Sequence, residues 1–223
     1  RLLLFVSPDP GDGRSTLVAN LARIQRDAGE RVMVVEADFR RPSLGRLMGL
    51  PAARGLPDVL TGAASPHAAL QTVQRAPGEM APVPEPAFAG ATTTAVEERT
   101  DGVLSVLQSG GSIPNPPAML GSEAMAWLLR TVADEYDWVL IDAPCPLEVS
   151  DALALFPLVD GLVVVARMGH TRIVSAERLV QLIERTVSAP TLGAVVNGVS
   201  RRDLERSGFY VSGGSTRRGS LRR

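Results

Sequence analysis

Short, unbroken apolar runs recur along the chain, and this pattern constrains the fold more than any other feature. The runs are residues 2–6, Val32–Val35, Val103–Leu107, Trp138–Ile141, Gly161–Ala166 and Leu192–Val196. Strands buried on both faces read as continuous apolar runs, whereas strands with one wet face alternate. Helical patterns lie between several of these runs. The sequence therefore predicts an α/β fold, a doubly wound, mostly parallel sheet with helices on both faces.

The helical patterns are amphipathic, with the apolar side chains three or four residues apart. In the first helix the pattern places Leu17, Leu21, Ile24 and Ala28 on one face, and Gly29 ends the helix. The other helices are expected as two short ones within residues 55–75, one over Ser122–Ala133 with Met125, Leu128, Leu129 and Val132 buried, and one over residues 175–186.

Composition and length indicate a single domain with an accessory segment and a tail. We expect the domain to cover residues 1–200, with a flexible insertion at 76–101, where Pro, Ala, Gly, Thr and Glu dominate. Residues 201–223 form a tail, expected to be disordered, in which seven arginines face two acids. That tail is either a solvated end or a contact with anionic lipid.

Charge and cysteine content exclude some classes of function. The net charge is −1, so the chain has no overall electrostatic attraction to nucleic acid, and no nucleic-acid partner is expected. Cys145 is the single cysteine, which rules out an internal disulfide and favours a reducing, cytoplasmic location.

A glycine-containing loop follows the first apolar run and precedes the first helix. The segment Ser7–Thr16 reads SPDPGDGRST. Gly11 and Gly13 allow the backbone to curl so that amide groups face a phosphate, and the helix that follows adds its positive end. Ser15 could place its hydroxyl on Mg²⁺, with Thr16 near the α-phosphate. An ordinary glycine-containing turn is the alternative.

Carboxylates follow two further apolar runs. Glu36 and Asp38 come two residues apart after the run that ends at Val35, and Asp142 follows the run that ends at Ile141. Carboxylates at the carboxyl ends of strands can face a metal-bound phosphate, because Mg²⁺ prefers oxygen ligands. The alternatives are a solvated loop for the first pair and a loop-capping acid for Asp142.

Taken together, these three segments resemble the Walker A, Walker A′ and Walker B motifs of deviant P-loop ATPases. More narrowly, the chain resembles the bacterial tyrosine autokinases that regulate capsule and exopolysaccharide chain length. The segments that carry the resemblance are the Ser7–Thr16 loop, Glu36–Leu50, Gly55–Gly62, Ile113–Met125 and Val159–Arg172. The resemblance implies a P-loop NTPase fold and binding of ATP or ADP with Mg²⁺.

The resemblance also assigns roles to individual residues. Phosphates would bind to Pro10, Gly11, Asp12, Gly13, Arg14, Ser15 and Thr16. The metal would be held by Ser15, Asp38 and Asp142. The catalytic group would comprise Arg14, Glu36, Asp38 and Asp142. Asn197 matches a position that contacts adenine in this superfamily, with capping of a strand end as the alternative.

Departures from the family pattern predict a kinase that is weak or inactive. Arg14 stands where the family has a lysine, and a planar guanidinium cannot occupy the same slot as a compact ammonium. All 23 basic side chains are arginine, so the replacement agrees with a preference that runs through the whole chain. Glu36 replaces the first acid of the Walker A′ pair. A tyrosine cluster is absent, which leaves Tyr210 as the candidate phosphoacceptor.

The resemblance implies a regulator at the inner face of the cell membrane. Its partner would be a membrane-bound polysaccharide co-polymerase or its own upstream transmembrane segment, and it could form a homo-oligomer. A positioning or partition ATPase is one alternative. Those proteins carry an extra lysine at the place held here by Asp9, where a negative side chain would repel a partner's phosphates. A non-catalytic scaffold that acts on a membrane partner is the other.

Overall fold

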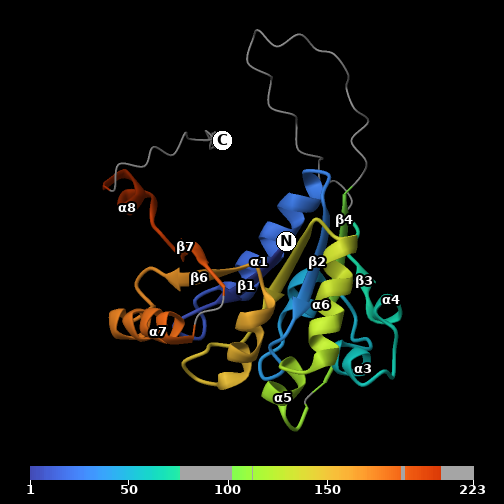
Figure 1. Cartoon of the computed structure of the whole chain (residues 1–223). Coiled ribbons are helices and arrows are strands. Elements are labelled where there is room, and N and C mark those ends of the chain that lie inside the picture. Colours follow the sequence, from blue (N-terminus) through green and yellow to red (C-terminus); the bar gives the residue numbers. More distant parts are fainter. Residues whose placement is uncertain (76–101, 112, 187–188, 207–223) are drawn as a thin grey trace, which may run out of the picture.

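The computed structural model describes residues 1–75, 102–111, 113–186 and 189–206 (Figure 1). Its strands are β1 (Leu2–Val6), β2 (Arg31–Glu36), β3 (Gln71–Thr72), β4 (Val103–Leu107), β5 (Trp138–Asp142), β6 (Gly161–Arg167) and β7 (Thr191–Asn197). Its helices are α1 (Arg14–Asp27), α2 (Leu44–Met48), α3 (Leu56–Leu60), α4 (Pro66–Ala69), α5 (Pro116–Leu120), α6 (Glu123–Glu135), the 3₁₀ segment η1 (Ser150–Leu158), α7 (Ile173–Thr186) and α8 (Arg201–Arg206).

The seven strands form one sheet in the order β3-β4-β2-β5-β1-β6-β7. Six strands run parallel, and the short β3 pairs antiparallel with β4 at the edge. Figure 1 shows α7 beside the β6 and β7 end of the sheet and α3 and α4 beside the β3 end. The predicted mostly parallel α/β fold is confirmed, and so are the six strands expected from the apolar runs.

Two apolar cores lie on opposite faces of the sheet, because successive side chains of a strand point to opposite sides. In β1, Leu2, Leu4 and Val6 belong to one core, whereas Leu3 and Phe5 belong to the other. The first core also takes side chains from α3, α5, α6, η1 and α7, and the second takes side chains from α1 and α2. Helices therefore cover both faces, as predicted.

Helix α6 matches its prediction closely, and α1 does not. The hydroxyl of Ser122 caps α6 by accepting the backbone N–H of Met125 at 3.2 Å, and the four side chains predicted to be buried are buried. In α1 the buried apolar side chains are Val18, Ala19 and Ala22, whereas Ile24, placed on the apolar face by the sequence pattern, is 64% exposed. The predicted face of α1 is therefore right only in part, since Leu17 and Leu21 pack partly buried against the second core whereas Ile24 and Ala28 are exposed.

Two further segments differ from their predictions. Residues 55–75 contain the two expected short helices and also the edge strand β3. The tail was expected to be disordered from residue 201, but its first six residues form α8. The predicted insertion at 76–101 and the candidate phosphoacceptor Tyr210 lie outside the described residues. None of the helices in the described ranges combines the length and apolar character that a membrane crossing requires.

Candidate functional site

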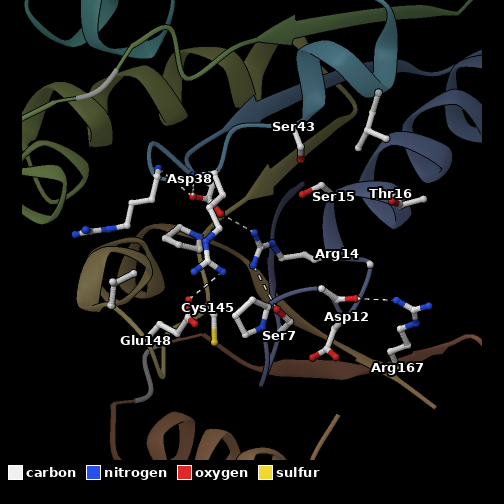
Figure 2. Close-up of a pocket in the computed structure, with 18 of the residues that line it drawn as sticks. Ser7, Asp12, Arg14, Ser15, Thr16, Asp38, Ser43, Cys145, Glu148 and Arg167 are labelled. Carbon is white, nitrogen blue, oxygen red and sulfur yellow. Dashed lines mark hydrogen bonds and ion pairs between the residues drawn. The ribbon is translucent and has the colours of Figure 1, made fainter. Parts of the chain in front are cut away.

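A cleft of about 590 Å³ lies at the carboxyl-terminal edge of the sheet (Figure 2). The central strands bring its parts together: Asp142 at the end of β5 pairs with Phe5 of β1 on one side and with Glu36 of β2 on the other. The backbone N–H of Ala37 also donates to the carbonyl of Asp142 at 2.8 Å. The loops after β1, β2 and β5 therefore meet at one place, as their order in the sequence predicted.

The loop after β1 forms one wall of this cleft. Gly11 and Gly13 have φ angles of 85° and 88°, a backbone conformation that favours glycine. Helix α1 starts directly after Gly13, so its positive end faces the cleft. All seven predicted phosphate-binding residues, Pro10 to Thr16, line the cleft. This arrangement suits an anionic ligand.

The Arg14 side chain is directed at the neighbouring loops (Figure 2). Its guanidinium is buried, and its Nε donates to Oδ1 of Asp142. Nη2 donates to Oδ2 of Asp38 at 3.0 Å, and Nη1 donates to Oγ of Ser7 at 3.3 Å. One cation thus joins the ends of β1, β2 and β5 through two buried ion pairs.

Burial and charge act against each other in this cluster. Burial alone would lower the pKa of Arg14, but Asp142 and Asp38 outweigh it, and its pKa is raised. Burial likewise raises the pKa of the Asp142 carboxyl, while Arg14 opposes that effect. A guanidinium at hydrogen-bond distance favours the ionised acid. Arg14 and a hydrogen bond from Ser15 therefore offset part of the effect of burial on the pKa of Asp142.

A magnesium ion does not fit this arrangement of Ser15, Asp38 and Asp142. Mg²⁺ requires nearly octahedral oxygen ligands, yet the guanidinium of Arg14 already lies against both carboxylates. Within the described residues, no group of three or more His, Cys, Asp or Glu side chains could hold a metal ion. Ser15 lines the cleft as predicted, but the predicted ligand set is not free to act together.

Glu36 accepts hydrogen bonds from two neighbouring loops, and its predicted catalytic role stays a prediction. Its Oε1 accepts the backbone N–H groups of Ser43 at 2.6 Å and Leu44 at 2.7 Å, at the start of α2. Its Oε2 accepts the backbone N–H and the hydroxyl of Ser109 at 3.1 and 3.0 Å. Of Glu36 and Asp38, Asp38 is the one that lines the cleft. Glu36 instead ties α2 and the loop after β4 to the end of β2.

Asn197 contacts the phosphate loop from the end of β7. Its Nδ2 donates to the carbonyl of Asp12 at 2.8 Å. A Cβ at Gly13 would lie 2.7 Å from the same Nδ2 and would displace the Asn197 side chain, and the φ of 88° at Gly13 also favours glycine. This bond is neither the predicted contact with adenine nor the alternative, capping of a strand end. The proposed contact with adenine stays a prediction.

Two acids of the phosphate loop attach it to the loop between β6 and α7. Asp9 accepts from the backbone N–H and the guanidinium of Arg172 at 3.0 and 2.8 Å and from the hydroxyl of Ser175 at 3.0 Å. Asp12 accepts from the hydroxyl of Thr171 at 2.6 Å, and Nδ1 of His170 lies 3.0 Å from the same oxygen. The charge of Asp9 is thus balanced within the chain, which weakens the argument that it would repel a partner's phosphates.

We expect Asp9→Asn to make the protein less sensitive to acid. The hydrogen bond from Arg172 lowers the pKa of Asp9 from 3.8 to about 2. The stabilisation from this group is complete above the unfolded pKa and is lost as the pH falls through the folded pKa. The variant should lose about 1 kcal/mol at neutral pH, since Arg172 is mostly exposed and the pair is screened, and lose less than the wild type on acidification.

Urea unfolding at neutral pH and at a pH between these two pKa values measures both effects. Glu184→Gln, an exposed acid on α7, is the control that should follow the wild type. Equal acid sensitivity of the wild type and the Asp9→Asn variant would contradict the assignment.

Several cleft residues were not selected as site residues from the sequence. The additional charged side chains that line the cleft are Arg40, Arg41, Arg46, Glu148 and Arg167. The signal for the first two was their position directly after Asp38. Arg167 ends β6, and its guanidinium donates to the carbonyl of Gly11 at 3.3 Å. With Arg14, five arginines line the cleft.

Cys145 is buried and lines this cleft. Its thiol lies 3.0 Å from the carbonyl of Pro8, to which it donates. Burial raises the pKa of this thiol, so it is a weaker nucleophile than an ordinary cysteine.

Solved structures of related proteins support the fold. The chimerical protein CapA2B2 aligns with a TM-score of 0.73 and 28% identity over 89% of this chain and 76% of that chain. The septum site-determining protein MinD of Pyrococcus horikoshii, solved in complex with Mg-ADP, aligns with a TM-score of 0.63 over 91% of this chain and 73% of that one. At 19% identity, the second match shows the fold alone.

Comparison with curated proteins gives the family, although the sequence matches no protein-family profile. The succinoglycan biosynthesis transport protein ExoP of Rhizobium meliloti is 27% identical over 94% of this chain, which spans only 23% of ExoP. The tyrosine-protein kinase YwqD of Bacillus subtilis is 30% identical over 93% of this chain and 76% of its own length. With these matches and a P-loop cleft at the strand ends, the chain belongs to the bacterial tyrosine-protein kinase family.

Proposed function

We propose that this chain is a nucleotide-binding regulatory domain for the assembly and export of exopolysaccharide or capsule. The observation that carries the proposal is the convergence of residues Pro10 to Thr16, Asp38 and Arg14 on one cleft. The similarity to ExoP, named for succinoglycan biosynthesis transport, supports the polysaccharide process. Membership of the tyrosine-protein kinase family supports the proposal that the cleft binds a nucleotide.

ATP or ADP is the proposed ligand. A cleft of about 590 Å³ falls within the usual size range of small-ligand sites. The start of α1 and the five arginines supply positive charge for phosphate groups. The structurally similar MinD was solved in complex with Mg-ADP, which supports a nucleotide as the ligand.

Tyrosine kinase activity is proposed to be weak or absent. Arg14 is engaged with Asp38 and Asp142, so it is not placed as a mobile point charge for a transferring phosphoryl group. Glu36 accepts four hydrogen bonds elsewhere. Tyr210 is the proposed acceptor for any residual transfer. We expect phosphoryl transfer to fall much more than nucleotide binding.

The proposed location is the cytoplasmic face of the cell membrane. The partner would be a membrane-bound polysaccharide co-polymerase or the protein's own upstream transmembrane segment, and copies of the chain would assemble with one another. A net charge of −1 gives the chain no overall attraction to nucleic acid.

Calorimetry followed by a radiolabel transfer assay tests the proposal. We expect ADP and ATP to bind, and we expect self-labelling from γ-labelled ATP at least tenfold below that of YwqD assayed in parallel, a difference of more than about 1.4 kcal/mol in transition-state stabilisation. The Tyr210→Phe variant is the control for the labelled site. Absence of nucleotide binding would refute the proposed function, and labelling at the level of YwqD would refute the loss of activity.

A further inference from the structure

The oxygen atoms that would bind a metal ion in this cleft are almost all engaged. Oδ1 of Asp38 accepts the backbone N–H groups of Arg40 and Arg41 at 3.1 and 3.0 Å. Oδ2 of Asp38 and Oδ1 of Asp142 both accept from Arg14. Among buried side-chain oxygens of the described residues, only Oδ2 of Asp142 has no hydrogen-bond partner. Neither carboxylate therefore has both oxygens open to Mg²⁺, which is usually held by one or two carboxylates together with waters and substrate phosphates.

Arg14 provides in this place what a divalent cation provides elsewhere, a positive charge shared between two acids. Buried carboxylates are costly unless they are paired, and the ion pairs of Arg14 with Asp38 and Asp142 meet that need. A guanidinium carries five N–H donors. The bonds to Asp142, Asp38 and Ser7 use three of them, which leaves two for a phosphate oxygen.

The rest of the cleft also offers arginines to phosphate groups. Its lining includes five arginines and three acids, Asp12, Asp38 and Glu148. Asp38 is paired with Arg14, Glu148 lies 3.5 Å from Arg41, and Arg40 is paired with Asp151 at 2.8 Å. Asp12 is bonded to Thr171. Arginine pairs with phosphate oxygens through charge-assisted hydrogen bonds.

We propose that Arg14 takes the place of the divalent cation, so that this cleft binds a nucleoside diphosphate or triphosphate without Mg²⁺. This inference rests on the proposed nucleotide-binding function and specifies its metal requirement. Lysine at the same position has three donors on a compact, flexible group. It cannot bridge both carboxylates and also contact phosphate in the way the fork of Arg14 does, and it leaves carboxylate oxygens open to a metal.

The test is calorimetric titration of the chain with ADP, once in EDTA and once in MgCl₂. We expect the wild-type Kd to be the same in both buffers to within about twofold, less than 0.5 kcal/mol. For Arg14→Lys we expect ADP to bind at least tenfold more tightly with MgCl₂ than with EDTA. Arg130→Lys, at an exposed arginine of α6, is the matched control and should behave as the wild type.

The outcomes separate this inference from the function on which it rests. Wild-type binding that requires MgCl₂ overturns the inference and leaves nucleotide binding intact. Absence of ADP binding in both buffers overturns nucleotide binding, and the inference with it. Metal-independent binding by a folded Arg14→Lys variant, with folding checked by circular dichroism, shows that Arg14 does not replace the ion. If that variant does not fold, the wild-type comparison decides alone.

Discussion

Arg14→Met is expected to lower the free energy of unfolding by about 3–5 kcal/mol, because it removes the cation from a buried ion-pair cluster. Asp38 and Asp142 are 6% and 1% exposed, and each pairs with the guanidinium of Arg14. Methionine keeps a long apolar side chain but leaves two buried carboxylates close together without a counterion. Urea unfolding monitored by circular dichroism at neutral pH measures the loss.

A double-mutant cycle shows whether the loss comes from the ion pairs. In the variant that combines Arg14→Met with Asp142→Asn, one of the unpaired charges is gone, so the loss should be clearly smaller than the sum of the two single losses. Arg130→Met, on the exposed face of α6, controls for the loss of an arginine. Strictly additive losses would mean that Arg14 and Asp142 do not stabilise each other.

Glu36→Gln is expected to cost about 3 kcal/mol of stability, since a buried carboxylate that accepts four hydrogen bonds becomes an amide. The amide nitrogen of glutamine is a donor, so it would face either the backbone N–H groups of Ser43 and Leu44 or the N–H and hydroxyl of Ser109. Chemical denaturation of the purified variant gives the change directly.

The same variant separates the structural role of Glu36 from the catalytic one suggested by its place in the Walker A′ segment. If Glu36 is structural, the Glu36→Gln variant should be less stable than the wild type, and its folded fraction should retain the wild-type affinity for ADP. If Glu36→Gln is as stable as the wild type but has lost phosphoryl transfer, the catalytic role is restored. Glu184→Gln, at an exposed position on α7, is the control for the chemical change itself.

Strand positions were predictable because burial on both faces removes polar residues from a strand altogether. The core of β5, Val139 to Ile141, is wholly buried between two layers of helices, and its sequence is correspondingly apolar. The buried face of α1 was not predictable in the same way. This helix buries Val18 and the small side chains of Ala19 and Ala22 against the sheet, whereas the larger Leu17 and Leu21, which the apolar pattern favoured, are only partly buried against the same core. A close helix–sheet contact selects small residues that hydrophobicity alone ranks low.

The location of the site also followed from sequence, since carboxyl ends of adjacent parallel strands meet at one edge of a sheet. The directions of its side chains did not. The acids of two other loops orient the Arg14 side chain. A hydrogen bond from Ser109, which is 73 residues away along the chain, orients Glu36. Such partners are brought together only by tertiary packing. Local spacing therefore locates these groups without showing what they bond to.

The hydrogen bonds from Asp9 and Asp12 to residues 170–175 tie the phosphate loop to the start of α7, so the two segments move together. Any rearrangement of the loop either breaks these bonds or displaces the first turn of α7 with it. The exposed apolar side chains Ile173 and Val174 lie on that turn. Binding or release of a ligand in the cleft can thereby shift the exposed side chains on the first turn of α7, without a domain motion.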